Sequence, residues 1–113
     1  MDAVRKDVEL LVKKELESAN KMFPLFHSVH EGYAVIWEEV EEAQEYFADT
    51  KSNLGSIWIG VRSGYDKESY EIAALDLKNS AIGLAIEAIQ VAAMAQKFID
   101  SEKARIEEES CKE

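Results

Sequence analysis

Residues 81–95 read AIGLAIEAIQVAAMA, a segment rich in alanine and isoleucine that is apolar on nearly every side of a helix. A helix of this kind is expected to be buried on most sides. Glu87 and Gln90 lie inside it, and a carboxylate buried without a partner is costly unless it changes its protonation. The segment therefore predicts a buried helix with one polar seam, in which Glu87 needs a metal ion, a basic side chain or a proton. The simpler alternative is a glutamate that is exposed or paired with a lysine.

The segments before this helix also have the period of helices. Apolar residues with a 3.6-residue period predict a helix over 2–22, and Pro24 follows its end. Ser28 and Glu31 have the spacing of a capping box, in which Ser28 accepts from the third amide and Glu31 reaches back. They predict a second helix that begins at Ser28 and ends near Asp49.

The middle of the chain is less regular. Residues 50–64 contain three glycines, and we expect a loop there in which Trp58 is packed. A third helical region is expected over about 66–101, with a break at 79–80, where Asn and Ser compete for backbone hydrogen bonds. The charged tail over 102–113 is expected to fray. Together these segments predict an all-α fold, a compact helical bundle of about four helices that is completed by oligomerisation.

Length and charge restrict the class of protein. A chain of 113 residues and 12.7 kDa allows one domain, which we predict to span residues 1–113. Acidic residues outnumber basic ones 23 to 13, giving a net charge of −10, which argues against nucleic acid or an anionic membrane as partner. The single cysteine, Cys111, cannot form an intramolecular disulfide. With no apolar signal segment and no uncharged apolar run of about 18 residues, we expect a cytoplasmic protein.

A cluster of glutamates on the second predicted helix is the first candidate for chemistry. Glu39 and Glu42 are three residues apart and share one helix face. Glu38 and Glu41 have the same spacing, so the spacing alone does not choose between the two pairs. Clustered carboxylate oxygens are ligands that Mg²⁺ prefers. The alternative is a solvated acidic face opposite the apolar one.

The simplest arrangement lets the two polar faces meet. Glu39 and Glu42 from one helix, with Glu87 and Gln90 from the other, would then hold one or two divalent ions, Mg²⁺ or Mn²⁺. A metal ion would also let an anionic substrate approach a chain of this charge. Lys97 lies near Gln90 on the helical wheel and is the first candidate for contacting phosphates.

The two motifs also resemble those of a known family. EE-x-x-E at residues 38–42 and E-x-x-Q at 87–90 look like the E-E-x-x-E … E-x-x-D signature of the MazG-like, all-α nucleoside triphosphate pyrophosphohydrolases. The likeness covers residues 28–49 and 81–100, and within these HEGYAV (30–35) and QVAAMA (90–95) are similar to small phage and bacterial members.

The resemblance implies a dimer or tetramer in which helices of neighbouring subunits complete the site. It implies Mg²⁺-dependent cleavage of a nucleoside triphosphate between its α- and β-phosphates, releasing the monophosphate and pyrophosphate. By position, Glu39, Glu42 and Glu87 would be metal ligands, with Gln90 as a further ligand. Glu38 would be a ligand or would orient the attacking water.

Two departures from the family pattern leave alternatives open. Gln90 replaces the family's final Asp, and an amide oxygen brings neither charge nor basicity. The 44 residues between Glu42 and Glu87 exceed the usual gap, so the middle of the chain must hold an insertion or an extra helix. The alternatives are a catalytically weakened nucleotide- or metal-binding relative and a non-enzymatic helical oligomerisation protein. After Lys97, the further candidates for contacting phosphates are Lys13, Lys14, Lys21 and Arg62.

Overall fold

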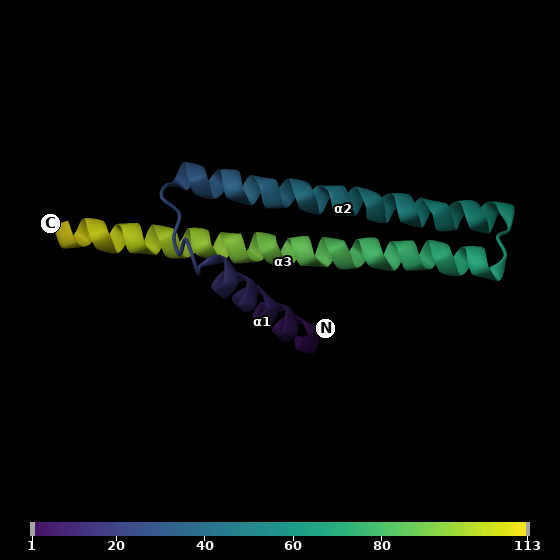
Figure 1. The fold of residues 1–113 in the computed structure, drawn as a ribbon, viewed down its shortest axis with the longest axis horizontal. Coiled ribbons are helices and arrows are strands. Elements are labelled where there is room, and N and C mark those ends of the chain that lie inside the picture. The colour runs from purple at the N-terminus through teal and green to yellow at the C-terminus, as the bar shows by residue number, and fades with distance from the viewer. Residues whose placement is uncertain (1, 113) are drawn as a thin grey trace. The chain divides into compact units, whose positions relative to one another are not determined.

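The computed structural model describes residues 2–112, without the side chains of residues 111 and 112, so Cys111 is outside the described side chains. The described chain forms three α-helices and no strand, which confirms the all-α fold (Figure 1). The helices are α1 (Asp2–Ala19), α2 (Val29–Ser63) and α3 (Lys67–Lys112). The helices are fewer and longer than the expected four, and oligomerisation stays a prediction.

The contacts divide the chain into two units, Met1–Glu39 with Ala88–Glu113, and Val40–Glu87. The first unit contains α1, the start of α2 and the last part of α3. The second unit is a helical hairpin made of the rest of α2 and α3. The 44 residues between Glu42 and Glu87, where an insertion or an extra helix was expected, form no additional helix: except for the turn, they belong to α2 and α3, as the flanking motifs do.

The first unit is organised around Phe26, Ala93 and Met94, which are buried. Phe26 lies in the connection between α1 and α2, and its backbone N–H donates to Ser101 Oγ at 2.9 Å. Gly32 leaves room for an aromatic ring, because a Cβ there would lie 2.6 Å from Cδ2 of Phe98. Partly buried apolar residues complete this core: Val12, Leu16, Ala19, Val35, Ile36 and Phe98.

At the start of α2, one of the two hydrogen bonds predicted for the capping box is present. The backbone N–H of Glu31 donates to Ser28 Oγ at 3.1 Å, which confirms Ser28 as the N-cap. The Glu31 carboxylate bonds to His27 rather than to the Ser28 amide, with Oε2 3.0 Å from His27 Nδ1. The hydrogen bond to the His27 side chain lowers the pKa of Glu31.

The hairpin corrects two predictions. Residues 50–64 were expected to form a loop, but all of them except Gly64 belong to α2. The break expected at 79–80 is also absent, because α3 is continuous there. The polar residues serve the contact between the helices instead of ending them: Asn53 Nδ2 donates to Asp76 O and to Ser80 Oγ, both at 3.1 Å.

A tight turn joins α2 to α3. Gly64 has φ +78°, a conformation that favours glycine, and its N–H donates to Gly60 O at 2.7 Å. Asp66 then caps α3, because its Oδ1 accepts from the Ser69 N–H at 2.8 Å. The Tyr70 hydroxyl donates to Gly60 O at 2.8 Å and ties the two helix ends together.

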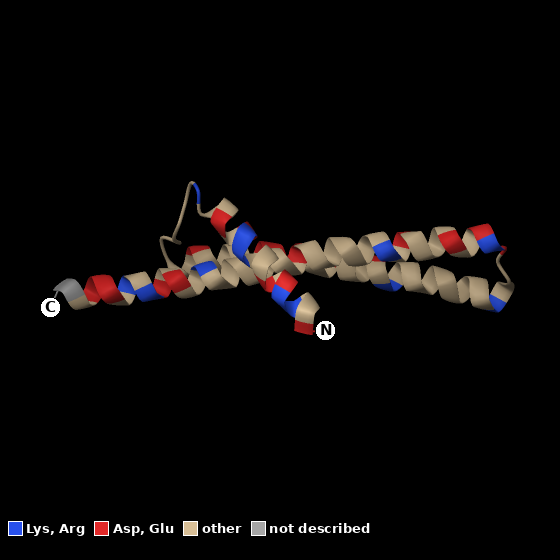
Figure 2. Cartoon of the chain, turned by 90° about the horizontal axis from the view of Figure 1, so that it is seen from below, with Lys and Arg blue, Asp and Glu red and all other residues tan. Residues whose placement is uncertain are grey.

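The apolar helix over 81–95 is less buried than expected. Ile82 and Ile86 keep 49% and 51% of their surface exposed, because within the hairpin α2 covers one side of α3. Among the described residues, α3 is the one helix that is long and apolar enough to cross a membrane. Core helices of soluble proteins meet the same criteria of length and composition. The charged segment expected to fray continues α3 through Lys112 and carries both acidic and basic residues (Figure 2).

Candidate metal centre

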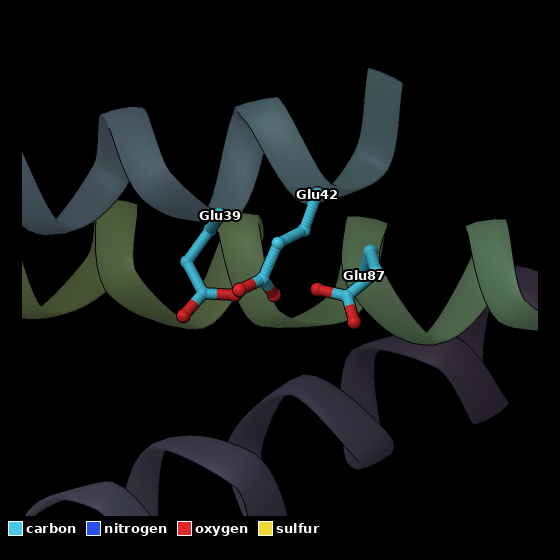
Figure 3. A group of neighbouring side chains, drawn as sticks. All are labelled: Glu39, Glu42 and Glu87. Atoms are coloured by element: carbon cyan, nitrogen blue, oxygen red, sulfur yellow. The ribbon is translucent and has the colours of Figure 1, made fainter. Parts of the chain in front are cut away.

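Three of the predicted ligands come together. One carboxylate oxygen each of Glu39, Glu42 and Glu87 lies within 4.8 Å of the other two. Figure 3 shows the three side chains pointing toward a common point, two from α2 and one from α3. Glu39 and Glu87 are half-buried, whereas Glu42 is exposed to solvent.

The helices position these side chains through their register. Glu39 and Glu42 are one turn apart on α2, so their side chains lie on the same face. Across the hairpin, the Tyr46 ring occupies the space where a Cβ of Gly83 would be. Tyr46 follows Glu42 by one turn and Gly83 precedes Glu87 by one turn. Because the two helices are antiparallel, this contact places Glu42 opposite Glu87.

The spacing of the oxygens suits a small divalent ion. Oxygen ligands of Mg²⁺ lie about 2.1 Å from the ion, so neighbouring ligands are about 3.0 Å apart and opposite ligands about 4.2 Å apart. Oxygens within 4.8 Å of one another reach these separations with small side-chain rotations. Carboxylates at this separation repel one another, and a divalent cation among them removes that repulsion.

The structure distinguishes between the two glutamate pairs that the spacing allowed. The glutamate pair that faces α3 is Glu39 and Glu42, and neither Glu38 nor Glu41 is part of the group. Glu38 is exposed on α2. Gln90 is half-buried on α3, one turn after Glu87, and belongs to the first unit. The side chains of these helices thus supply three carboxylates and, next to them along α3, one amide.

Lys97 has surroundings that the sequence did not indicate. Its side chain is 6% exposed, and its Nζ lies 4.8 Å from the centre of the Phe26 ring. The ammonium is also close enough to Glu31 to attract its carboxylate and to contribute to the lowered pKa of Glu31. In the first unit Lys97 therefore packs into the core under Phe26, a role that a single Lys on a helical wheel does not reveal.

The other basic candidates differ in their positions. Lys13 lines a groove of about 450 Å³ between α1 and α3, together with Val12, Leu16, Ala92 and Gln96. Lys14, Lys21 and Arg62 are exposed to solvent. Lys13 therefore lies in a concave part of the described surface.

Comparison with known proteins adds no relative. No protein-family model, curated protein or solved structure matches the chain.

Proposed function

We propose that this chain is a metal-dependent nucleotide pyrophosphohydrolase of the MazG-like type, which cleaves a nucleoside or deoxynucleoside triphosphate to the monophosphate and pyrophosphate. The observation that carries the proposal is the convergence of Glu39, Glu42 and Glu87. These are the positions that the resemblance in sequence assigns to metal ligands, and they come from two separate motifs. A solvated acidic face on one helix would not require the third carboxylate from α3.

The carboxylates of Glu39, Glu42 and Glu87 hold the metal ion in this proposal, with the amide oxygen of Gln90 as a further ligand. When bound, Mg²⁺ supplies the positive charge that neutralises phosphate oxygens and lowers the pKa of the attacking water. Glu38 accepts a hydrogen bond from that water and orients it, since its side chain is exposed beside the cluster on α2. Each of these roles uses a carboxylate or amide oxygen, so none requires a nucleophile from the protein.

The basic contact to the phosphates is assigned to Lys97. This assignment requires the ammonium to leave the face of the Phe26 ring when a substrate binds, since Lys97 is buried beneath it. Lys13, in its groove beside α1, is the alternative. Lys97→Met and Lys13→Met separate the two assignments by their effects on KM.

The proposal includes a homodimer or homotetramer in the cytoplasm, with neither nucleic acid nor a membrane as partner. Its support is the apolar surface of the hairpin, where the buried residues are the small ones Gly60, Ala73 and Ser80. A two-helix hairpin has no further layer to cover its large apolar side chains. Another subunit supplies such a layer.

The test is an assay of purified protein against a panel of ribo- and deoxyribonucleoside triphosphates, with and without Mg²⁺ or Mn²⁺. Metal-dependent release of both pyrophosphate and monophosphate is the expected result. In parallel, either ion is expected to raise the melting temperature of the wild type and not of Glu87→Gln. Glu45→Gln is the control, because Glu45 is an exposed glutamate of α2, the helix of Glu39 and Glu42, and is outside the cluster.

Two other functions are distinguished by the same experiment. A metal-dependent rise in melting temperature without product release would indicate a catalytically weakened nucleotide- or metal-binding relative, with Gln90 as the position where a base was lost. No response to metal at all would favour a non-enzymatic self-association protein. The exposure of large apolar side chains such as Trp37 and Trp58, 51% and 58%, supports that second candidate.

A further inference from the structure

The outer side of α2 within the hairpin carries a stripe of large exposed side chains. The exposed fractions of Phe47, Leu54, Trp58 and Val61 are 53%, 58%, 58% and 59%. With Lys51, whose Nζ lies 5.8 Å from the centre of the Phe47 ring, they recur at alternating spacings of four and three residues. This 3.5-residue period is typical of helices that pack side by side along their length. We call these five residues the α2 stripe.

The α2 stripe is separate from the face by which α2 contacts α3. Tyr46 packs at Gly83, and Asn53 donates to Ser80. Gly60 lies against the ring of Tyr65 in the turn and accepts from the Tyr70 hydroxyl of α3. The α2 stripe follows the same heptad spacing one residue later, and so lies about 100° around the helix. One side of α2 is thus covered within the chain, and a second side with the same period is not.

Gly55, beside the α2 stripe, has no role that the single chain explains. Gly32, Gly60 and Gly83 each leave space for an aromatic ring of the same chain, whereas no described residue has an atom within 4 Å of a Cβ built on Gly55. A glycine inside a helix costs about 1 kcal/mol relative to alanine. Gly55 is therefore a position where the backbone of α2 is open to close approach from outside. Ala48, seven residues earlier, is another small residue on this side.

We infer that the α2 stripe binds the α2 stripe of a second copy of this chain, with the two helices antiparallel. The charges beside the stripe favour this occupant and this direction. Glu41 and Arg62 are exposed and continue the series of Ala48 and Gly55 at seven-residue intervals. An antiparallel pair places Glu41 next to Arg62 of the second copy at both ends of the contact. A parallel pair would place Glu41 next to Glu41 and Arg62 next to Arg62.

The same register gives complementary layers in the middle. Phe47 lies against Trp58 of the second copy, Lys51 lies against Leu54, and Ala48 faces Gly55, where the backbones approach most closely. The contact is isologous, so each pairing occurs twice. The inference rests on the homo-oligomer of the proposed function, not on its nucleotide chemistry, and it names the surface that holds two copies together.

The first test is sedimentation velocity of the full chain at micromolar concentration. The wild type is expected to be dimeric or tetrameric, and Leu54→Lys is expected to raise the dissociation constant at least about thirtyfold, because two lysines enter the contact, each against Lys51 of the other copy. Ile72→Lys is the matched control: Ile72 is 55% exposed on α3 and lines a groove with Ser56, on the opposite side of α2 from the stripe, so the dissociation constant of this variant should stay within about threefold. A monomeric wild type, or an assembly that Leu54→Lys leaves unchanged, would overturn the inference.

The second test measures the direction of the helices. In a Cys111→Ser background, Ala48→Cys combined with Gly55→Cys should give a disulfide-linked dimer on oxidation, whereas Ala48→Cys alone should not. The two introduced cysteines cannot pair within one helix, because seven residues span about 10 Å. Glu41→Arg should weaken the dimer, and Glu41→Arg with Arg62→Glu should restore it. Equal cross-linking by the single and double cysteine variants, or no recovery in the double charge reversal, would contradict the antiparallel register.

The outcomes also separate this inference from the rest of the proposed function. An assembly that survives Leu54→Lys keeps the homo-oligomer and overturns the α2 stripe as its interface. A chain that dimerises through the α2 stripe but releases no pyrophosphate supports the inference and contradicts the nucleotide chemistry alone.

Discussion

Glu42 and Glu87 bring carboxylate oxygens within 4.8 Å of each other although 44 residues separate them in the chain. The packing of Tyr46 on Gly83 fixes this relationship, because each of these residues lies one turn from one of the two glutamates. The candidate metal centre therefore depends on an aromatic residue and a glycine that would not themselves touch a metal ion.

Replacing Gly83 tests this dependence. A Cβ at position 83 would overlap the Tyr46 ring, so Gly83→Ala should lower the free energy of unfolding by about 1–3 kcal/mol, although alanine favours helices. In a Tyr46→Ala background the same change should be neutral or raise the stability by up to about 1 kcal/mol. Urea unfolding of the four proteins, at one protein concentration, gives the comparison. An equal loss in both backgrounds would mean that the ring does not set the register.

Gln90→Asp should strengthen metal binding. The change adds a carboxylate one turn after Glu87, and the number of charged ligands tunes the affinity of such sites. We expect the dissociation constant for Mn²⁺ to fall about tenfold in a calorimetric titration. Asn79→Asp, at an exposed position of the same helix, adds the same charge away from the cluster and should leave the constant nearly unchanged. If both variants tighten binding alike, the effect is one of net charge and not of ligation.

The sequence predicted the helical class and the start of α2 but not the length of the helices. Ser28 could be predicted as the N-cap from its residue type and from the glutamate three positions later. Both signals are local in the sequence. Gly60 and Asn53 look like residues of a loop, yet in the structure one makes room for the Tyr65 ring and the other bonds across to Ser80. Their roles depend on a second helix, and no local pattern contains that information.

For the same reason, the residues of the candidate site could be predicted only in part from the sequence. The motif spacing shows which glutamates share a face, but Glu38 with Glu41 fits as well as Glu39 with Glu42. The choice between the two pairs depends on how α2 is rotated toward α3, which the contacts of Tyr46 with Gly83 and of Asn53 with Ser80 determine. The burial of Lys97 under Phe26 was not foreseen, because it depends on how the connection after α1 folds back onto α3.

Lys97 variants separate a structural role from a substrate-binding role. Lys97→Met keeps the length and apolar stem of a buried side chain, so it should change the free energy of unfolding by less than about 2 kcal/mol, including the lost interaction with the Phe26 ring. If Lys97 contacts phosphate, the same variant should raise KM for the nucleotide more than it lowers kcat. Lys13→Met is the comparison. If KM rises only in Lys13→Met, the phosphate contact is assigned to Lys13, in the groove beside α1.

The cap of α3 should make stability depend on pH. The hydrogen bonds from Ser69 lower the pKa of Asp66 below its ordinary value of 3.8. The ionised carboxylate therefore stabilises the fold above that value, and this contribution is lost as the pH falls through the lower pKa of the folded state. Asp66→Ala should be less stable than the wild type at neutral pH, and the difference should shrink in acid. Denaturant unfolding across the acidic range measures it, and a difference that grows in acid would contradict the assignment.

The most direct measurement on the candidate metal centre is pyrophosphate release from nucleoside triphosphates by the wild type, Glu87→Gln and Glu45→Gln, each with and without Mg²⁺. We predict Mg²⁺-dependent release by the wild type and by Glu45→Gln, with a loss of at least about a hundredfold in Glu87→Gln. Release that is equal in the two variants, or that does not require the metal ion, would contradict a catalytic centre built from Glu39, Glu42 and Glu87.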